Sequence, residues 1–280
     1  MSQPLPPTDR WIVFTDLDGT LLDHHSYRWD AAAPALGRLV ARGVPVVPNS
    51  SKTLAELATL AAELDLPWPV VAENGSVVAW PAGRADATHE LGGRRWRVQF
   101  LGRPRPDILA TLRDLRAARG WRFRGFADMT PAEIAALTGL DAAAAARAAE
   151  RLASEPLLWE DEAAEPAALA GALAAAGLQL TRGGRFWHAM GRTSKAAAMA
   201  AVAAALGRDF VIALGDGPND AEMLAAADVA IIVHNPEGNP PELPPGPGQR
   251  RLYTRAAGPA GWAEAMDALL DAARKGESHG

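Results

Sequence analysis

The chain has 280 residues, and its 28 basic against 33 acidic side chains give a net charge of −5. This mildly acidic balance argues against a nucleic-acid or anionic-membrane partner. The absence of cysteine excludes disulfide frameworks, thiolate zinc sites and cysteine nucleophiles. No stretch approaches the roughly 18 apolar residues that span a bilayer, and residues 1–10 lack the apolar core of a signal peptide. We therefore expect a cytoplasmic protein, and its length predicts either two domains or one domain with an insertion.

Short apolar runs alternate with amphipathic helical patterns at the start of the chain. The runs lack polar alternation, which is typical of strands buried on both faces of a parallel sheet. Their order, strand–helix–strand–helix–strand, predicts an α/β fold with a Rossmann-like parallel sheet. The turn signal Glu-Asn-Gly then leads into a fourth strand. The predicted elements are strands at 11–15, 44–47, 70–72 and 76–80 and helices at 30–42 and 53–64.

The pattern changes after residue 82, where glycine and proline punctuate a polar stretch and half-exposed strands replace the buried ones. We interpret 83–188 as an inserted α+β cap domain, with 1–82 and 189–280 as the two parts of the core domain. The predicted cap elements are strands at 96–101, 121–126, 156–159 and 178–180 and helices at 106–119, from Thr130 onward, 142–152 and 166–176. The core resumes with helices at 194–206, 219–226 and 261–274, strands at 210–214 and 229–233, and a loop at 239–248.

Four groups of polar residues follow predicted strands or begin a predicted helix. In open α/β sheets, ligands bind at the carboxyl ends of the strands, so such residues are candidates for a common site. Each group alone has a plainer interpretation, since a DxD loop, a serine after a strand and an Asp-rich turn are more often helix caps or solvated loops. The groups are DLDGT at 16–20, NSSK at 49–52, Lys195, and GDGPND at 215–220.

The charges in these groups favour a shared site. Asp16 and Asp18 would repel each other unless a cation or protons intervene. Asp216 and Asp220 offer the hard oxygen atoms that Mg²⁺ prefers. Lys195, one of three lysines in the chain, stands in the first turn of a helix, where the helix dipole disfavours a cation unless it faces an anion. The charges therefore predict a site for an anion and a divalent cation.

In order and kind, the four groups resemble the signature motifs of the haloacid dehalogenase superfamily of phosphotransferases. The insertion after the third strand looks like the larger α+β cap of the subgroup that acts on phosphosugars and related small molecules. More narrowly, the strings SSKT, AENG, GGRFWH and ALGDGPND are similar to mannosyl-3-phosphoglycerate phosphatases.

The resemblance implies a phosphomonoesterase with Mg²⁺ as cofactor and a small phosphorylated sugar or glycosyl-glycerate as substrate. Asp16 would be the nucleophile, forming an aspartyl-phosphate, and Asp18 the general acid and then base. Ser50 would bind a phosphoryl oxygen, and Lys195 would neutralise the phosphoryl group. The implied metal ligands are Asp16, Asp18 through its carbonyl, Asp216 and, in support, Asp220.

Substrate recognition rests on shorter strings. Lys52 and Thr53 would receive a glycerate carboxylate, and Glu73 and Asn74 would bind sugar hydroxyls. Two residues of the GGRFWH hairpin would close over the ligand, although an ordinary half-buried hairpin position explains the histidine equally well. These two residues are Arg185 and His188.

Other functions fit the sequence less well. Within the same fold, the substrate could instead be glucosyl-3-phosphoglycerate or another sugar phosphate. A phosphomutase is disfavoured because nothing indicates that the phosphoryl group is returned to the product. A signalling receiver domain lacks both the inserted cap and the second aspartate, and an inactive sensor would not need the complete charged set. A nicotinamide dehydrogenase is excluded, since no G-x-G-x-x-G follows the first strand.

Overall fold

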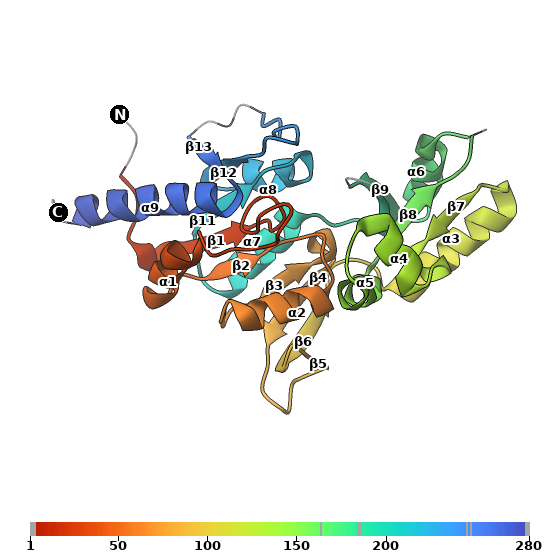
Figure 1. The fold of residues 1–280 in the computed structure, drawn as a ribbon, viewed down its shortest axis with the longest axis horizontal. Coiled ribbons are helices and arrows are strands. Elements are labelled where there is room, and N and C mark those ends of the chain that lie inside the picture. The colour runs from red at the N-terminus through yellow and green to blue at the C-terminus, as the bar shows by residue number, and fades with distance from the viewer. Residues whose placement is uncertain (1–3, 163, 184–185, 245, 247, 278–280) are drawn as a thin grey trace. The chain divides into compact units, whose positions relative to one another are not determined.

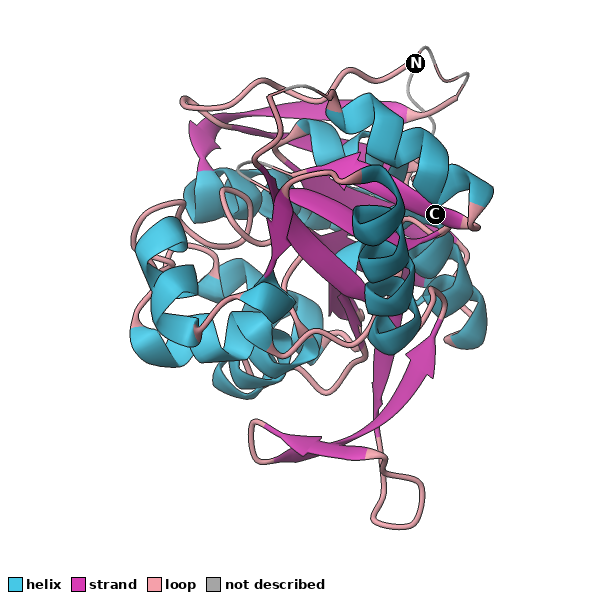
Figure 2. Ribbon diagram, turned by 90° about the vertical axis from the view of Figure 1, so that its right-hand side faces the viewer, coloured by secondary structure: helices cyan, strands magenta, loops and turns pink. Residues whose placement is uncertain are grey.

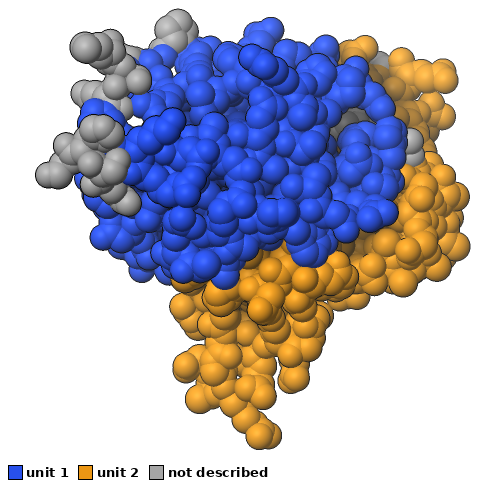
Figure 3. Space-filling view, turned by 60° about the vertical axis from the view of Figure 1, so that its left-hand side comes forward, with its two compact units in different colours: residues 1–50, 195–280 blue, residues 51–194 orange. Residues whose placement is uncertain are grey.

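The computed structural model describes residues 4–162, 164–183, 186–244, 246 and 248–277. The chain divides into two compact units, one formed by residues 1–50 and 195–280 and the other by 51–194 (Figure 3). These divisions differ from the predicted domain limits, because segments 51–82 and 189–194 group with the second unit. The assignment of 83–188 as the substrate-selecting domain stays a prediction. Within the described residues, no helix is long and apolar enough to cross a membrane.

The first unit is built on a five-stranded sheet in the order β13-β12-β11-β1-β2, and every neighbouring pair is parallel (Figure 1). This confirms the predicted α/β class. The strands are β1 (Trp11–Thr15), β2 (Val46–Pro48), β11 (Phe210–Gly215), β12 (Val229–His234) and β13 (Arg250–Ala257). The helices are α1 (Ala33–Ala41), α7 (Lys195–Ala205), α8 (Ala221–Ala225) and α9 (Gly258–Glu277), with short 3₁₀ turns η1 (Thr8–Arg10) and η4 (Pro218–Asp220).

Burial of strand β1 inside the sheet explains its apolar sequence. All five residues of β1 are buried, because strands flank it on both edges and helices cover the sheet (Figure 2). Helix α9 contacts β12, β13 and α1, and its Trp262 is fully buried. The Trp262 Nε1–H donates to Thr15 Oγ1 at 3.1 Å, which fixes the last residue of β1. The strand therefore ends in a defined position, immediately before Asp16.

The second unit contains two antiparallel sheets, in the orders β3-β4-β6-β5 and β7-β8-β10-β9. The strands are β3 (Val70–Ala72), β4 (Val77–Pro81), β5 (His89–Leu91), β6 (Arg94–Phe100), β7 (Phe123–Gly125), β8 (Ser154–Trp159), β9 (Leu178–Arg182) and β10 (Trp187–Gly191). The helices are α2 (Leu54–Glu63), α3 (Arg105–Arg119), α4 (Pro131–Thr138), α5 (Ala142–Ala149) and α6 (Pro166–Ala175), with turns η2 (Glu73–Gly75) and η3 (Phe126–Asp128).

The pairing predicted for one strand was wrong. The run at 70–72 was expected in the parallel sheet, but β3 pairs antiparallel with β4 across the turn η2. The physical reason lies in that turn, where Glu73, Asn74 and Gly75 all have positive φ and reverse the chain. The Glu-Asn-Gly turn itself was predicted correctly.

Local sequence signals predicted most helix ends, whereas the edge strands β5 and β13 were not predicted. Thr53 and Thr130 each begin a helix with a capping box, as the Ser/Thr-x-x-Glu pattern indicates. Strand β13 was not predicted because it follows a proline-rich loop and its residues are half-buried or exposed, alternating only from Leu252 onward. Such a pattern is typical of an edge strand, and here β13 pairs only along β12 within the described sheet.

Candidate active site

The parallel register brings the motifs of the first unit to one edge of its sheet. Thr15 pairs with Pro48 on one side and with Leu214 on the other. Asp16 and Asn49 directly follow two of these positions, and Asp216 follows Gly215, the last residue of β11, so the three loops leave the sheet side by side. The backbone N–H of Asp16 donates to Leu214 O at 2.9 Å, and that of Asn49 donates to Thr15 O at 2.8 Å. The predicted convergence at the carboxyl ends of the strands is therefore present in this unit.

Lys195 lies at the centre of the acidic residues. Its Nζ donates to Asp16 Oδ1 and to Asp220 Oδ1, each at 2.6 Å, and only 3% of the residue is exposed. Burial opposes the charged form, but the two carboxylates outweigh it and raise the pKa of Lys195. The lysine in the first turn of α7 thus faces anions, as its unfavourable position in the helix dipole predicts.

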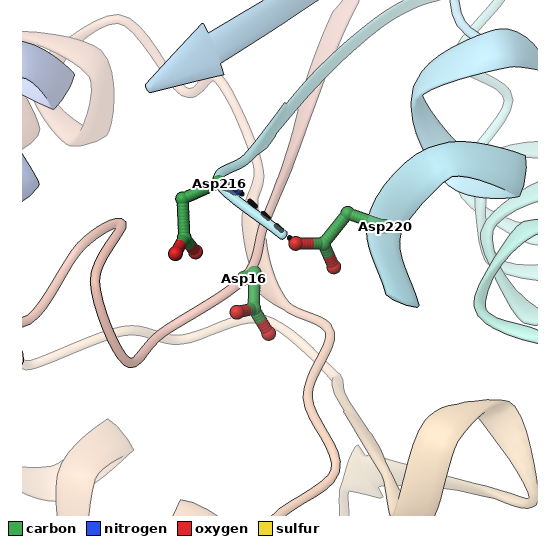
Figure 4. A group of neighbouring side chains, drawn as sticks. All are labelled: Asp16, Asp216 and Asp220. Carbon is green, nitrogen blue, oxygen red and sulfur yellow. Dashed lines mark hydrogen bonds between the residues drawn. The ribbon is translucent and has the colours of Figure 1, made fainter. Parts of the chain in front are cut away.

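Negative charge exceeds positive charge in this group. Burial, followed by the charge of Asp16, raises the pKa of Asp220 to about 7 despite its bond to Lys195. The same two causes raise the pKa of Asp216. One carboxylate oxygen from each of Asp16, Asp216 and Asp220 lies within 4.8 Å of the other two (Figure 4). Clustered hard oxygen atoms with surplus negative charge fit a Mg²⁺ ion.

Asp216 is oriented by two neutral donors. Thr20 Oγ1 donates to Asp216 Oδ1 at 2.7 Å, and Asn235 Nδ2 donates to Asp216 Oδ2 at 2.6 Å. Sequence reasoning missed Asn235. The signal was present, because Asn235 follows the apolar strand β12 directly, as Asp16 follows β1 and Asn49 follows β2.

The loop after β2 is held against the start of α7. Asn49 is fully buried, and its Nδ2 donates to Lys195 O at 3.0 Å. The same amide lies 3.3 Å from Met223 Sδ in α8. Ser50 follows and is 2% exposed. The side chain of Asp18 is half-buried and lies outside the group of three carboxylates, so the roles of Ser50 and Asp18 stay predictions.

The predicted substrate residues Lys52 and Thr53 belong to the second unit. Thr53 is the N-cap residue of α2 and is fully buried. Its Oγ1 donates to Glu56 Oε2 at 3.0 Å and to Arg147 O at 2.9 Å. These bonds give Thr53 a structural role. Lys52 is half-buried, and its carbonyl accepts a hydrogen bond from the Glu73 N–H at 2.9 Å.

Glu73 is fully buried, and its carboxylate accepts three hydrogen bonds from the residues that lead into β8. The donors are Leu152 N at 2.7 Å, Ala153 N at 3.1 Å and Ser154 Oγ at 2.6 Å. These bonds offset the cost of the positive φ of 52° at a non-glycine residue. The carboxylate that was expected to bind sugar hydroxyls is thus engaged within the protein. Asn74, beside it, is half-buried with φ 56°.

Glu73→Gln is therefore expected to lower the free energy of unfolding by about 2 kcal/mol. The side-chain NH₂ of glutamine would face at least one of the N–H or O–H groups that donate to the Glu73 carboxylate, and that hydrogen bond would be lost. Urea unfolding measures this change. The matched control is Glu63→Gln on the exposed surface of α2, which should change stability by less than about 0.5 kcal/mol. Unchanged stability together with a raised KM would contradict the structural role and favour the predicted contact with sugar.

The hairpin residues expected to cover the ligand are only partly described. Arg185 lies outside the described residues. His188 is 8% exposed, and its Nδ1 has no hydrogen-bond partner in the part of the chain that the structure describes. Burial, and then the charge of Arg151, lowers the pKa of His188 to about 3, so the imidazole is neutral at physiological pH. Arg151 is fixed by its own bonds to Ala148 O and Ser51 O.

Comparison with known proteins agrees with this geometry. The profile of the haloacid dehalogenase-like hydrolases matches residues 12–228. A glucosyl-3-phosphoglycerate/mannosyl-3-phosphoglycerate phosphatase from Methanococcoides burtonii is 35% identical over 268 residues, which cover 92% of this chain and 97% of the relative.

Solved structures share the fold at lower identity. A phosphatase of the haloalkanoate enzyme superfamily from Bacteroides thetaiotaomicron is 18% identical, with a TM-score of 0.64 over 97% of this chain and 99% of that one. The sucrose-phosphatase from Synechocystis, solved with sucrose and phosphate, is 14% identical, with a TM-score of 0.57 over 93% and 98% of the two chains. The chain therefore belongs to the haloacid dehalogenase-like hydrolases, in the family of its phosphoglycerate phosphatase relative, and is a phosphoric monoester hydrolase.

Proposed function

We propose that the protein is a Mg²⁺-dependent phosphomonoesterase that hydrolyses mannosyl-3-phosphoglycerate to mannosylglycerate and phosphate. The observation that carries this proposal is the buried Asp16 carboxylate, held by Lys195 Nζ at 2.6 Å beside Asp216 and Asp220. The name of the Methanococcoides relative supports the substrate class. A cytoplasmic location fits a small-molecule substrate of this kind.

In the first half-reaction, a carboxylate oxygen of Asp16 attacks phosphorus. The bond between phosphorus and the glycerate oxygen breaks, and protonated Asp18 gives its proton to that oxygen as it leaves. The products are mannosylglycerate and an aspartyl-phosphate on Asp16. Since Asp16 follows the fixed end of β1, its carboxylate needs little reorganisation to reach the attacking position.

In the second half-reaction, a water molecule attacks the phosphorus of the aspartyl-phosphate. Asp18, now a carboxylate, takes a proton from the water, and the bond between phosphorus and the Asp16 oxygen breaks. Inorganic phosphate leaves, and both aspartates return to their starting forms.

The chain's cations and donors stabilise the charge during both steps. Lys195 neutralises the phosphoryl oxygens, and Ser50 at the end of β2 donates a hydrogen bond to one of them. A Mg²⁺ ion held by Asp16, Asp216 and the Asp18 carbonyl, with Asp220 in support, would supply the remaining positive charge. The surplus of carboxylates over ammonium groups at this site supports the need for such an ion.

Part of the substrate recognition is assigned to the second unit. The buried His188 Nδ1, which has no described partner, suits a sugar hydroxyl, and Lys52 suits the glycerate carboxylate. Glucosyl-3-phosphoglycerate is the second candidate substrate, because the name of the relative contains both sugars.

A substrate panel tests the proposal through release of inorganic phosphate with excess Mg²⁺. The panel holds mannosyl- and glucosyl-3-phosphoglycerate, 3-phosphoglycerate, mannose and glucose 6-phosphates, and an aryl phosphate. We expect kcat/KM for mannosyl-3-phosphoglycerate to exceed that for the simple phosphates by about 10²-fold or more, and EDTA to abolish turnover. Preference for the glucosyl ester would select the second candidate. Cleavage of the aryl phosphate alone would overturn the substrate, and turnover in EDTA would overturn the metal dependence.

A further inference from the structure

Asn235 completes the surroundings of Asp216. Strand β12 ends at His234, and the next side chain donates from Nδ2 to Asp216 Oδ2 at 2.6 Å. Thr20 Oγ1 donates to the other oxygen at 2.7 Å. Each oxygen of Asp216 therefore accepts one bond from a neutral donor, which fixes the plane of the carboxylate without reducing its charge. Each oxygen also keeps a lone pair for another ligand.

The amide of Asn235 is itself held in place. Its Oδ1 accepts the backbone N–H groups of Glu237 at 2.9 Å and Gly238 at 3.0 Å. The Glu237 Oε1 atom lies 2.6 Å from His25 Nε2, in the loop that follows the DLDGT motif. That loop is closed by Asp23, whose Oδ1 accepts bonds from Ser26 N and Oγ. The amide thus has one orientation, in which its NH₂ group points at Asp216.

We propose that Asn235 is a positioning residue, which orients the Asp216 carboxylate for the Mg²⁺ ion. The inference rests on the ion in the proposed function. A cationic side chain at this position would compete with the ion for Asp216, whereas an aliphatic one would leave Asp216 free to rotate. An amide with its own oxygen engaged avoids both, because it donates to the ligand and adds no charge. Partners of this kind set metal affinity in other proteins through the ligand that they orient.

Asn235→Ala tests this role in the full chain. Calorimetry without substrate measures the dissociation constant for Mg²⁺, and kinetics give the Mg²⁺ concentration for half-maximal activity. We expect both to rise by about tenfold or more, while kcat at saturating Mg²⁺ stays within about threefold of the wild type. The KM for substrate should not change, because Asn235 orients a metal ligand and has no assigned contact with the substrate.

The matched control is Gln249→Ala, which also removes an amide from the first unit. Gln249 Nε2 donates to the carbonyls of Leu224, Ala225 and Ala227. Its loss should lower stability but leave the affinity for Mg²⁺ unchanged. Asn235→Leu keeps the branching of the side chain at Cγ and replaces the alanine variant if that one does not fold.

Two outcomes overturn the inference, and they are distinguishable. A folded Asn235 variant whose dissociation constant for Mg²⁺ stays within about twofold of the wild type would show that Asn235 does not position the ligand. A wild-type protein that binds no Mg²⁺ in calorimetry would remove the ion from the proposed function, and the inference would fail with it.

Discussion

Asp16→Asn is expected to lower kcat by about four orders of magnitude or more while the protein stays folded. The amide cannot form the acyl-phosphate bond, so the first half-reaction has no nucleophile. The replacement has nearly the same size in a site that is 7% exposed. It also removes one negative charge from the cluster that contains Asp216 and Asp220. Phosphate release from mannosyl-3-phosphoglycerate and from an aryl phosphate measures the loss, and circular dichroism checks the fold.

Acid quenching during turnover separates covalent from direct attack. The wild type should carry acid-precipitable phosphate, and Asp16→Asn should carry none. The control is Asp209→Asn, which changes an exposed carboxylate paired with Arg10 at 2.7 Å. That variant should keep kcat within about twofold. If Asp16→Asn retained more than about a hundredth of the activity, water would be attacking the substrate directly and the nucleophile assignment would be wrong.

The convergence of the strand-end residues was predictable because one rule links the sequence to the position of such residues in the fold. A buried parallel strand is visible as an apolar run, and its carboxyl end meets those of its neighbours at one edge of the sheet. Asp16, Asn49 and Asp216 each follow such a run and converge. Lys195 was predictable for a different reason, since a lysine in the first turn of a helix needs an anion to face, and it contacts two.

Long-range pairing limited the rest of the prediction. The apolar run of β3 is equally compatible with a parallel or an antiparallel partner, and the positive-φ turn at η2 decided between them. The burial of Glu73 depends on Ser154 and its neighbours, which lie about eighty residues away in the chain. The sequence around Glu73 therefore contains no pattern that indicates these contacts. Asn235 does follow the strand-end rule and would have been found by applying it to β12.

Lys195→Met is the second substitution with a large expected effect. It removes the only described ammonium group bonded to Asp16 and Asp220. We expect kcat/KM to fall by about 10³-fold, because the phosphoryl charge loses a fixed counter-charge in a buried site. The free energy of unfolding should fall by about 3 kcal/mol in the metal-free protein, since buried carboxylates lose their partner.

The stability deficit of Lys195→Met should depend on pH with a defined sign. The pKa of Asp220 is already raised to about 7 by burial and by Asp16, with Lys195 opposing the shift. Without the lysine it rises further above the value of the unfolded chain. An acid whose pKa is higher in the folded state destabilises the fold as pH rises. The deficit should therefore be smaller at pH 5 than at pH 8, as urea unfolding in EDTA would show, and a deficit that shrinks as pH rises would contradict the ion-pair assignment.

Lys195→Arg separates charge from shape. Arginine keeps the positive charge. In the wild type, however, the single Nζ atom of Lys195 donates to Asp16 and to Asp220 at 2.6 Å each, whereas a planar guanidinium presents its donors in a wider fork. The site is 3% exposed and leaves little room for the larger group. We expect this variant to recover more of the stability than of the activity lost in Lys195→Met. Equal recovery of both would mean that charge alone suffices, and the compact geometry of the ammonium group would then have no part in catalysis.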